Sequence, residues 1–185
     1  MTFQLKIIVF LVASAGICYV SRASLQDPRS HGFYRFFAWE AILALILLNL
    51  DYWFNQPFSI RQIFSWTLLI VATGLVIHGA HLLRTMGKPD RTREDATLIG
   101  IEKTTELVTA GAYRYVRHPI YSSLLLLTWG VLFKHLSWVS VSVAAIATLF
   151  LVMTAKVEEA ENICFFGEAY RSYMKQTWMF VPFVL

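Results

Sequence analysis

The stretch Gly111-Ala112-Tyr113-Arg114-Tyr115-Val116-Arg117-His118-Pro119-Ile120-Tyr121 decides how the rest of the chain is interpreted. It places arginines, tyrosines and a histidine directly before an apolar run. Proline is favoured in the first turn of a helix, so we expect a helix to begin at Pro119 with His118 at its entrance. The free N–H groups of that turn suit a negatively charged ligand group. The stretch predicts either a ligand site or a belt of Tyr and Arg that anchors the chain at a membrane interface.

Apolar segments fill most of the 185 residues, and 57% of the chain is hydrophobic. That composition is unlike an ordinary soluble domain, and a helix that spans a bilayer needs about 20 mostly apolar residues. The candidate spans are Phe3–Val20, Phe36–Phe54, Ile63–Leu83, Ile120–Phe133 and Leu136–Met153. The sequence therefore predicts an all-α integral membrane protein with about five transmembrane helices, the last two in a tight hairpin, and a cytosolic amphipathic C-terminal segment.

One membrane domain over residues 1–185 is the simplest organisation. It divides into three N-terminal spans (1–83), a polar loop (84–118), the helical hairpin (119–153) and a tail (154–185). The polar segment 84–112 within that loop carries a charged, exposed turn at 91–95. A loop this long in so small a protein is usually functional, and it could fold over a bound ligand as a lid. The compact chain shows no targeting extension, which favours a bacterial inner membrane, with an organelle membrane as the alternative.

The basic residues predict the orientation of the helices. With the N-terminus outside, 13 of the 16 Lys and Arg residues fall on the inner side. The outer side then holds only Lys6, Arg61 and Lys134. Because inner loops are enriched in Lys and Arg, the 84–118 loop and the tail are expected on the cytoplasmic face. This bias accounts for the net charge of +4, and it predicts no nucleic-acid partner.

Ionisable residues within spans usually face the protein interior or water. Glu40 lies one to two turns into the second span, where it could face a site or pair with an arginine. His78 and His81 share one helix face, but no third ligand has suitable spacing, so packing is favoured over a metal pair. Cys18 and Cys164 lie in different segments and predict neither a disulfide nor a zinc site. No metal is therefore expected.

The tail carries carboxylates next to aromatic residues. In a continuous helix, one face would hold Ile163, Phe166, Tyr170, Tyr173 and Met174. Glu159 falls in the middle of that face and would need a partner, whereas a break at Gly167 would undo the projection. The alternatives are a binding-site carboxylate and an amphipathic surface helix with solvated acids.

Two motifs together resemble the isoprenylcysteine carboxyl methyltransferase family. Arg117-His118-Pro119-Ile120-Tyr121, preceded by Gly111-x-Tyr113-Arg114, is similar to its R-H-P-x-Y signature. Glu158-Glu159, Phe166-Gly167-Glu168-Ala169-Tyr170-x-x-Tyr173 and Pro182 are similar to its E-E…F-G-x-x-Y-x-x-Y…P ending. The resemblance covers about Leu107 to Pro182, and the first three spans match only in number and length.

The resemblance implies an integral membrane methyltransferase that uses S-adenosylmethionine and releases S-adenosylhomocysteine. Its cofactor pocket would lie at the cytosolic face, between the R-H-P loop and the tail. The cofactor-binding positions carried over are Thr105, Glu106, Leu107, Val108, Tyr113, His118, Pro119, Ile120, Tyr121 and Glu158. Arg117 suits the cofactor carboxylate, and tyrosine faces suit adenine and the sulfonium. No catalytic residue is assigned, and Arg117 and Glu159 are the weak candidates.

Two positions depart from the family pattern. The family's substrate-facing arginine, four residues before the first glutamate, is replaced here by Thr154, and a common glycine is replaced by Ser123. We therefore expect a lipophilic or amphipathic small acceptor that enters between helices from the surrounding lipids, and not a prenylated protein's carboxylate. The residues predicted for its pocket are Glu40, His78, His81 and Thr154.

Two other classes of function remain open at this stage. Some membrane sterol reductases have a related helical C-terminal architecture and use NADPH. A non-catalytic membrane protein could use the motif as a scaffold or a lipid head-group site.

Overall fold

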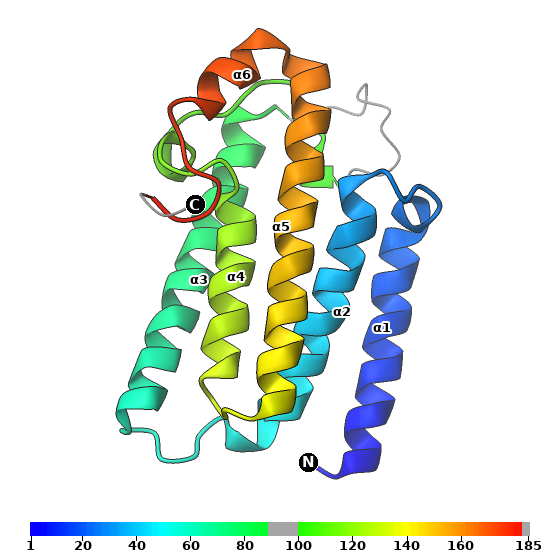
Figure 1. The fold of residues 1–185 in the computed structure, drawn as a ribbon, viewed down its shortest axis with the longest axis vertical. Helices are drawn as coiled ribbons and strands as arrows, with labels where there is room; N and C mark the ends of the chain where they lie inside the picture. Colours follow the sequence, from blue (N-terminus) through cyan, green and yellow to red (C-terminus); the bar gives the residue numbers. More distant parts are fainter. Residues whose placement is uncertain (89–99, 183–185) are drawn as a thin grey trace.

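The computed structural model describes residues 1–88 and 100–182, which fold into helices joined by short connections (Figure 1). Four helices are long and apolar enough to cross a membrane: α1 (Phe3–Leu25), α2 (His31–Asn49, prolonged by the 3-10 turn η1, Leu50–Tyr52), α3 (Ile60–Met86) and α5 (Trp138–Phe166). Between them, α4 (Pro119–Leu132) is a shorter apolar helix of 14 residues. The predicted helical membrane architecture is confirmed.

The helices extend beyond the apolar segments that revealed them. α2 begins at His31 and not at Phe36, and α5 ends at Phe166 and not at Met153. Hydropathy marks where the apolar composition ends, whereas the backbone hydrogen bonds continue until a residue stops them. In α5 that residue is Gly167, whose φ of +61° is the left-handed conformation that glycine adopts at little cost. The predicted span bounds were therefore too short at these ends.

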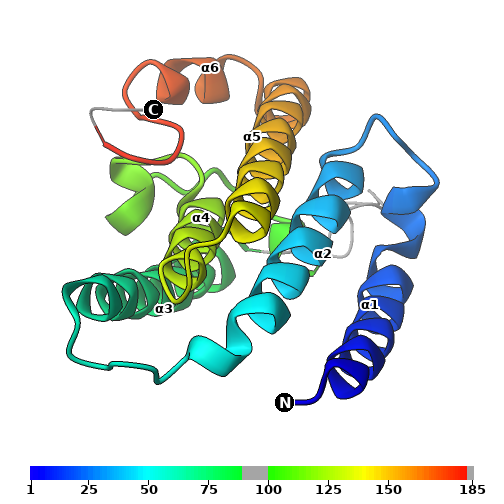
Figure 2. The same ribbon diagram turned by 60° about the horizontal axis from the view of Figure 1, so that its bottom comes forward.

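The helices lie side by side in the order α3, α4, α5, α2, α1 (Figure 2). α2 and α5 make the closest packing, where Ala38 and Ile42 of α2 meet Ala147 and Leu151 of α5. Small residues at these positions let the two backbones approach, as is typical of membrane helix pairs. α1 packs only against α2 among the described elements and presents most of its apolar side chains outward, which suits contact with lipid.

Polar side chains join the helices at the end opposite the chain's C-terminal tail. Lys134, in the turn of the α4–α5 hairpin, is fully buried, and its ammonium donates to Gln62 Oε1 at 3.0 Å. The same ammonium lies 3.5 Å from the Trp66 ring centroid, a cation–π contact. Burial lowers the pKa of Lys134 to about 8. The hairpin is thus tied to α3 by a buried amine, as well as by apolar packing.

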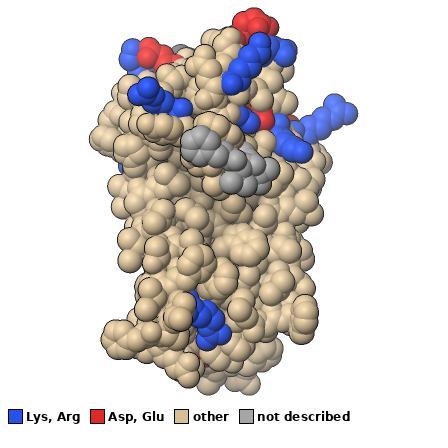
Figure 3. Space-filling view, turned by 60° about the vertical axis from the view of Figure 1, so that its left-hand side comes forward, with Lys and Arg blue, Asp and Glu red and all other residues tan. Residues whose placement is uncertain are grey.

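Charged side chains gather at the two ends of the bundle. Figure 3 shows a broad band without charge between them, as expected for the part that lies in the bilayer. The α4–α5 turn and the N-terminus lie at one end, and the tail and the polar loop lie at the other (Figure 1). The tail contains α6 (Glu168–Met174), which buries Tyr170 and Tyr173 and exposes Glu168 and Arg171. This confirms the predicted amphipathic segment.

Candidate functional site

The helix start at Pro119 is confirmed, and the chain's tail holds the loop in front of it. His118 is the N-cap residue of α4, and Pro119 occupies its first turn. Residues 115–118 run parallel to residues 178–180, because Trp178 N–H donates to Tyr115 O (3.0 Å) and Arg117 N–H donates to Trp178 O (2.8 Å). Segments about 60 residues apart in sequence are thereby fixed to each other at the mouth of α4.

Arg117 adds a buried ion pair to this clamp. Its Nε donates to Glu159 Oε1 at 2.6 Å, and both side chains are about nine-tenths buried. Its Nη1 donates to the carbonyl oxygens of Met174 and Thr177. From the sequence, Glu159 could be either a binding-site carboxylate or a solvated acid. In the structure it is buried and paired with Arg117. Arg117 therefore joins the loop, α5 and the tail.

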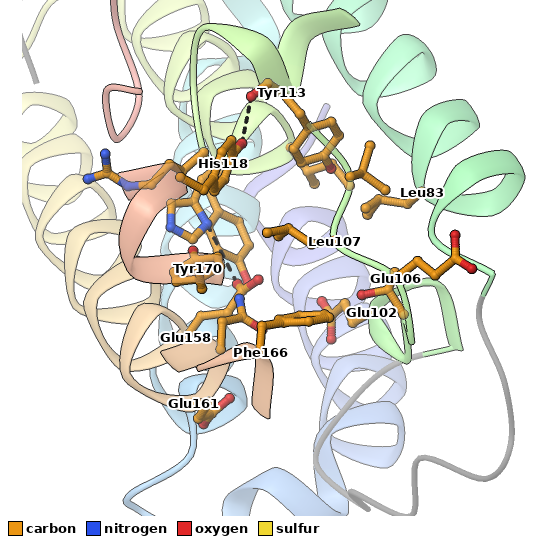
Figure 4. Close-up of a pocket in the computed structure, with 17 residues that line it drawn as sticks. Leu83, Glu102, Glu106, Leu107, Tyr113, His118, Glu158, Glu161, Phe166 and Tyr170 are labelled. Atoms are coloured by element: carbon orange, nitrogen blue, oxygen red, sulfur yellow. Dashed lines mark hydrogen bonds and ion pairs between the residues drawn. The ribbon is translucent and has the colours of Figure 1, made fainter. Parts of the chain in front are cut away.

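A cavity opens between the loop, α5 and α6 (Figure 4). It encloses about 730 Å³ of empty space, part of it open to solvent. Its walls come from α3, the loop, α4, α5 and α6, with Tyr113, His118, Tyr121 and Glu158 among the lining residues. His118 Nδ1 lies 3.9 Å from Glu158 Oε2, so the two motifs meet over one cavity.

A second charged cluster joins the loop to the start of α2. His31 is fully buried, and its Nδ1 lies 2.6 Å from Glu161 Oε2. Arg35, one turn further into α2, pairs with Glu102 of the short 3-10 helix η2 (Gly100–Glu102). Burial acts to raise the pKa of Glu102, but the hydrogen bond from His31 and the charge of Arg35 outweigh it and hold that pKa at about 2. Glu102 and Glu161 both line the cavity.

Three tyrosines shape the aromatic wall. Burial, together with the charge of Glu158, raises the pKa of Tyr113 and Tyr170 far above the ordinary value. Burial also raises the pKa of Tyr173, against the opposing charge of Arg117. All three hydroxyls therefore stay neutral at physiological pH. Tyr173 OH donates to Tyr113 O at 2.6 Å, which ties α6 to the 3-10 helix η3 (Gly111–Arg114).

Comparison with known proteins shows to which family the chain belongs. The sequence profile of the phospholipid methyltransferase family matches residues 60–169, which is more than half of the chain. The chain belongs to the phospholipid methyltransferase family. That match covers α3, the loop, α4, all of α5 and the start of α6, and the first four of these form most of the cavity.

The curated proteins that are similar to this chain are named as methyltransferases. A methanethiol S-methyltransferase of Pseudomonas deceptionensis is 27% identical over 74% of this chain and 55% of its own length. One from Crocosphaera subtropica is 26% identical over 65% of this chain and 44% of its own length. A protein-S-isoprenylcysteine O-methyltransferase of Dictyostelium discoideum is 24% identical over 76% of this chain and 60% of its own length. The chain thus spans about half the length of these relatives, and no solved structure matches it significantly.

Most of the predicted cofactor residues line the cavity. They are Glu106, Leu107, Val108, Tyr113, His118, Ile120, Tyr121 and Glu158, joined by Arg117. Thr105 does not line it, because its N–H and hydroxyl are used on Gly87 O and Lys88 O. Pro119 is fully buried and also lies outside the lining.

The four residues predicted for an acceptor pocket do not line this cavity. Glu40 accepts a hydrogen bond from Ser14 on α1, and Thr154 donates to Phe150 O within its own helix. His78 and His81 are largely exposed on α3. Their contact with an acceptor stays a prediction, and so does the lid, whose charged turn at 91–95 lies outside the described residues.

His31, Arg35, Glu102 and Glu161 were missed by the sequence reasoning. Their burial arises only when α2, η2 and α5 come together, so no single segment reveals it. The available signal was the spacing of His31 and Arg35, which places both on one face at the start of a span.

Proposed function

We propose that this protein transfers a methyl group from S-adenosylmethionine to a lipophilic or amphipathic acceptor within the membrane. The observation that carries the proposal is the meeting of His118 and Glu158 at one cavity, 3.9 Å apart, from the two motifs that resemble a methyltransferase signature. The family match and the methyltransferase names of the relatives support the same reaction class.

The residues of the cavity fit the proposed cofactor. S-adenosylmethionine carries a sulfonium and an amine, and the cavity offers the carboxylates of Glu102, Glu158 and Glu161. Aromatic faces suit both an adenine ring and a positive sulfonium, and Tyr113 and Tyr170 provide them. The first turn of α4 supplies N–H groups for the cofactor's carboxylate.

The bound cofactor would supply an electrophilic methyl group, so the chain's task is to position the reactants. Glu158 would hold the amine or the ribose hydroxyls, and His118 would orient Glu158. Tyr113 would pack against the adenine, held by Tyr173. Alignment of two reactants and exclusion of water account for much of the rate of such a displacement.

The distribution of the basic residues predicts how the chain is oriented in the membrane. The cavity lies at the end of the bundle that holds most of the basic residues, and the positive-inside rule places that end in the cytoplasm. We infer an N-terminus outside, a cytoplasmic tail and, for a bacterial protein, residence in the inner membrane.

Titration of the detergent-purified protein with S-adenosylhomocysteine tests the cofactor assignment. Glu158→Ala removes a charged contact worth about 1.5–3 kcal/mol, so we expect roughly ten-fold weaker binding or more. Glu168→Ala is the matched control, because Glu168 is exposed on α6 and does not line the cavity. Failure of the wild type to bind at millimolar ligand, or equal binding by Glu158→Ala, contradicts the proposal.

A further inference from the structure

Arg35 is a buried cation with hydrogen-bond donors to spare. Its side chain is 1% exposed, and its Nη1 contacts Glu102 and lies 3.4 Å from His31 Nε2. Its Nε and Nη2 have no hydrogen-bond partner among the described residues. A guanidinium has five N–H donors, and leaving such donors unpaired in the interior is costly. The guanidinium carbon also lies 5.0 Å from the Trp39 ring centroid, a cation–π contact that gives Nε and Nη2 no acceptor atom, so a further acceptor would complete the contacts of this group.

Tyr121 presents a second unused donor nearby. Its hydroxyl is buried and makes no hydrogen bond of good geometry with a described residue, although the Glu158 carboxylate lies close to it, and its side chain lines the cavity. Arg35 lies close enough to Tyr121 and to Glu158 to interact electrostatically with both. Donors from α2 and α4 thus converge beside the carboxylate already assigned to the cofactor.

Arg35 lies further into the bundle than the charged residues at the end of α5. α2 begins at the end of the bundle where α5 ends. There, near the cytosolic end, His31 pairs with Glu161. Arg35 lies one turn further along α2 and interacts electrostatically with Glu158, but it does not itself line the cavity. One turn deeper again, Ala38 belongs to the apolar cluster between α2 and α5. Arg35 consequently lies between the apolar interior and Glu102, the residue through which it contacts the cavity wall.

We propose that Arg35 and Tyr121 bind the negatively charged head of the methyl acceptor, a thiolate or carboxylate carried on an apolar body. The inference rests on the proposed function and deepens it. An anion is suited to a guanidinium fork, and an apolar body is suited to the interior beyond it. Thr154, where the resemblance placed an acceptor contact, has no charge and uses its hydroxyl on Phe150 O.

The charges balance in the resulting reaction. A thiol acceptor first releases its proton to solvent, which the positive charge of Arg35 favours; a carboxylate needs no such step. The acceptor's electron pair forms the new bond to the methyl carbon as the donor's carbon–sulfur bond breaks. That bond's electron pair stays on the donor sulfur, so the negative acceptor and the positive sulfonium both become neutral.

Binding of a matched pair of probes tests the assignment without turnover. Hexanoate and hexan-1-ol share an apolar chain and differ in charge. Each is titrated by calorimetry into protein saturated with S-adenosylhomocysteine. The wild type is expected to prefer hexanoate about ten-fold, which corresponds to one charge-assisted contact. Arg35→Gln should abolish that preference and leave hexan-1-ol binding unchanged, whereas Arg35→Lys should keep part of it.

Three further variants distinguish a direct role of Arg35 in binding the anion from a role in holding the structure together. Arg22→Gln removes an exposed positive charge at the same end of the bundle and should keep the full preference. Glu102→Gln should also keep it, because it removes a competitor for the guanidinium. Tyr121→Phe deletes only a hydroxyl and should lower the preference by a smaller factor, which provides a test if Arg35→Gln does not fold.

The outcomes distinguish this inference from the proposed function. Absence of S-adenosylhomocysteine binding by the wild type refutes the methyltransferase proposal. Normal binding of that ligand, with no hexanoate preference in the wild type or an intact preference in Arg35→Gln, overturns the role of Arg35 alone. An equal loss in Glu102→Gln would show that Arg35 only anchors η2. Weakened S-adenosylhomocysteine binding in Arg35→Gln with the preference intact would assign Arg35 to the cofactor instead.

Discussion

The ion pair between Arg117 and Glu159 should contribute more to stability than any surface pair in the protein. Arg117→Met keeps most of the side-chain volume but takes from the buried Glu159 carboxylate its permanently charged partner and leaves only His118, whose Nε2 lies 3.4 Å from Glu159 Oε1. Removing one member of a buried pair costs about 3–5 kcal/mol. At roughly 2–4 °C per kcal/mol for a chain of this length, the apparent Tm in detergent should fall by about 6 °C or more.

A double variant shows whether the cost arises from the stranded charge. Glu159→Gln added to Arg117→Met removes that charge, so the double variant should regain part of the lost Tm. Arg171→Met is the matched control, because Arg171 pairs with Glu168 on the surface and should barely change the Tm. A normal Tm for Arg117→Met, or a double variant whose losses simply add, would refute the argument.

Three other changes probe the remaining contacts of the site. Tyr173→Phe removes the hydrogen bond to Tyr113 O and should lower the Tm by about 2–4 °C, the effect of about 1 kcal/mol, with weaker S-adenosylhomocysteine binding in the same preparation. Gly111→Ala forces φ +57° on a residue with a Cβ and brings that Cβ 2.6 Å from His78 Nε2, so both Tm and ligand affinity should drop; unchanged values would contradict this geometry. Glu102 has its folded pKa at about 2, below the model-peptide value of 4.5, so its stabilisation is present above about pH 4.5 and is lost as the pH falls toward 2. A Tm series from pH 7 to pH 3 should therefore fall less steeply for Glu102→Gln than for the wild type, and parallel curves would count against the shifted pKa.

The membrane fold could be predicted from the sequence because lipid imposes a composition on every span. Apolar segments predicted the positions of α1 to α5 along the chain, and Pro119 predicted the start of α4. The same reasoning could not find the end of α5, since Val157 to Phe166 is helical without being part of an apolar run. Gly167 was the visible signal, and its positive φ confirms it as the stop.

The residues of the candidate site also fall into those that the sequence could predict and those that it could not. Tyr113, His118 and Glu158 could be predicted because they occupy motif positions whose order and spacing are specific. Arg35 and Glu102 could not, because their pairing depends on how α2 packs against α5 and on where the loop returns. Such contacts between segments carry no local pattern, and they become visible only in three dimensions.

The clamp between residues 115–118 and 178–180 has a consequence for biosynthesis. Arg117 and its acceptor Thr177 are 60 residues apart, and translation adds about 5–20 residues per second. The motif loop is therefore synthesised roughly 3–12 s before the tail segment that holds it in place. During that interval the nascent chain holds a motif loop that lacks its contacts with residues 177–180. A ribosome that stops before Thr177 would leave a bundle that has its helices and the aromatic wall of α6, but whose motif loop lacks the hydrogen bonds that hold it in place.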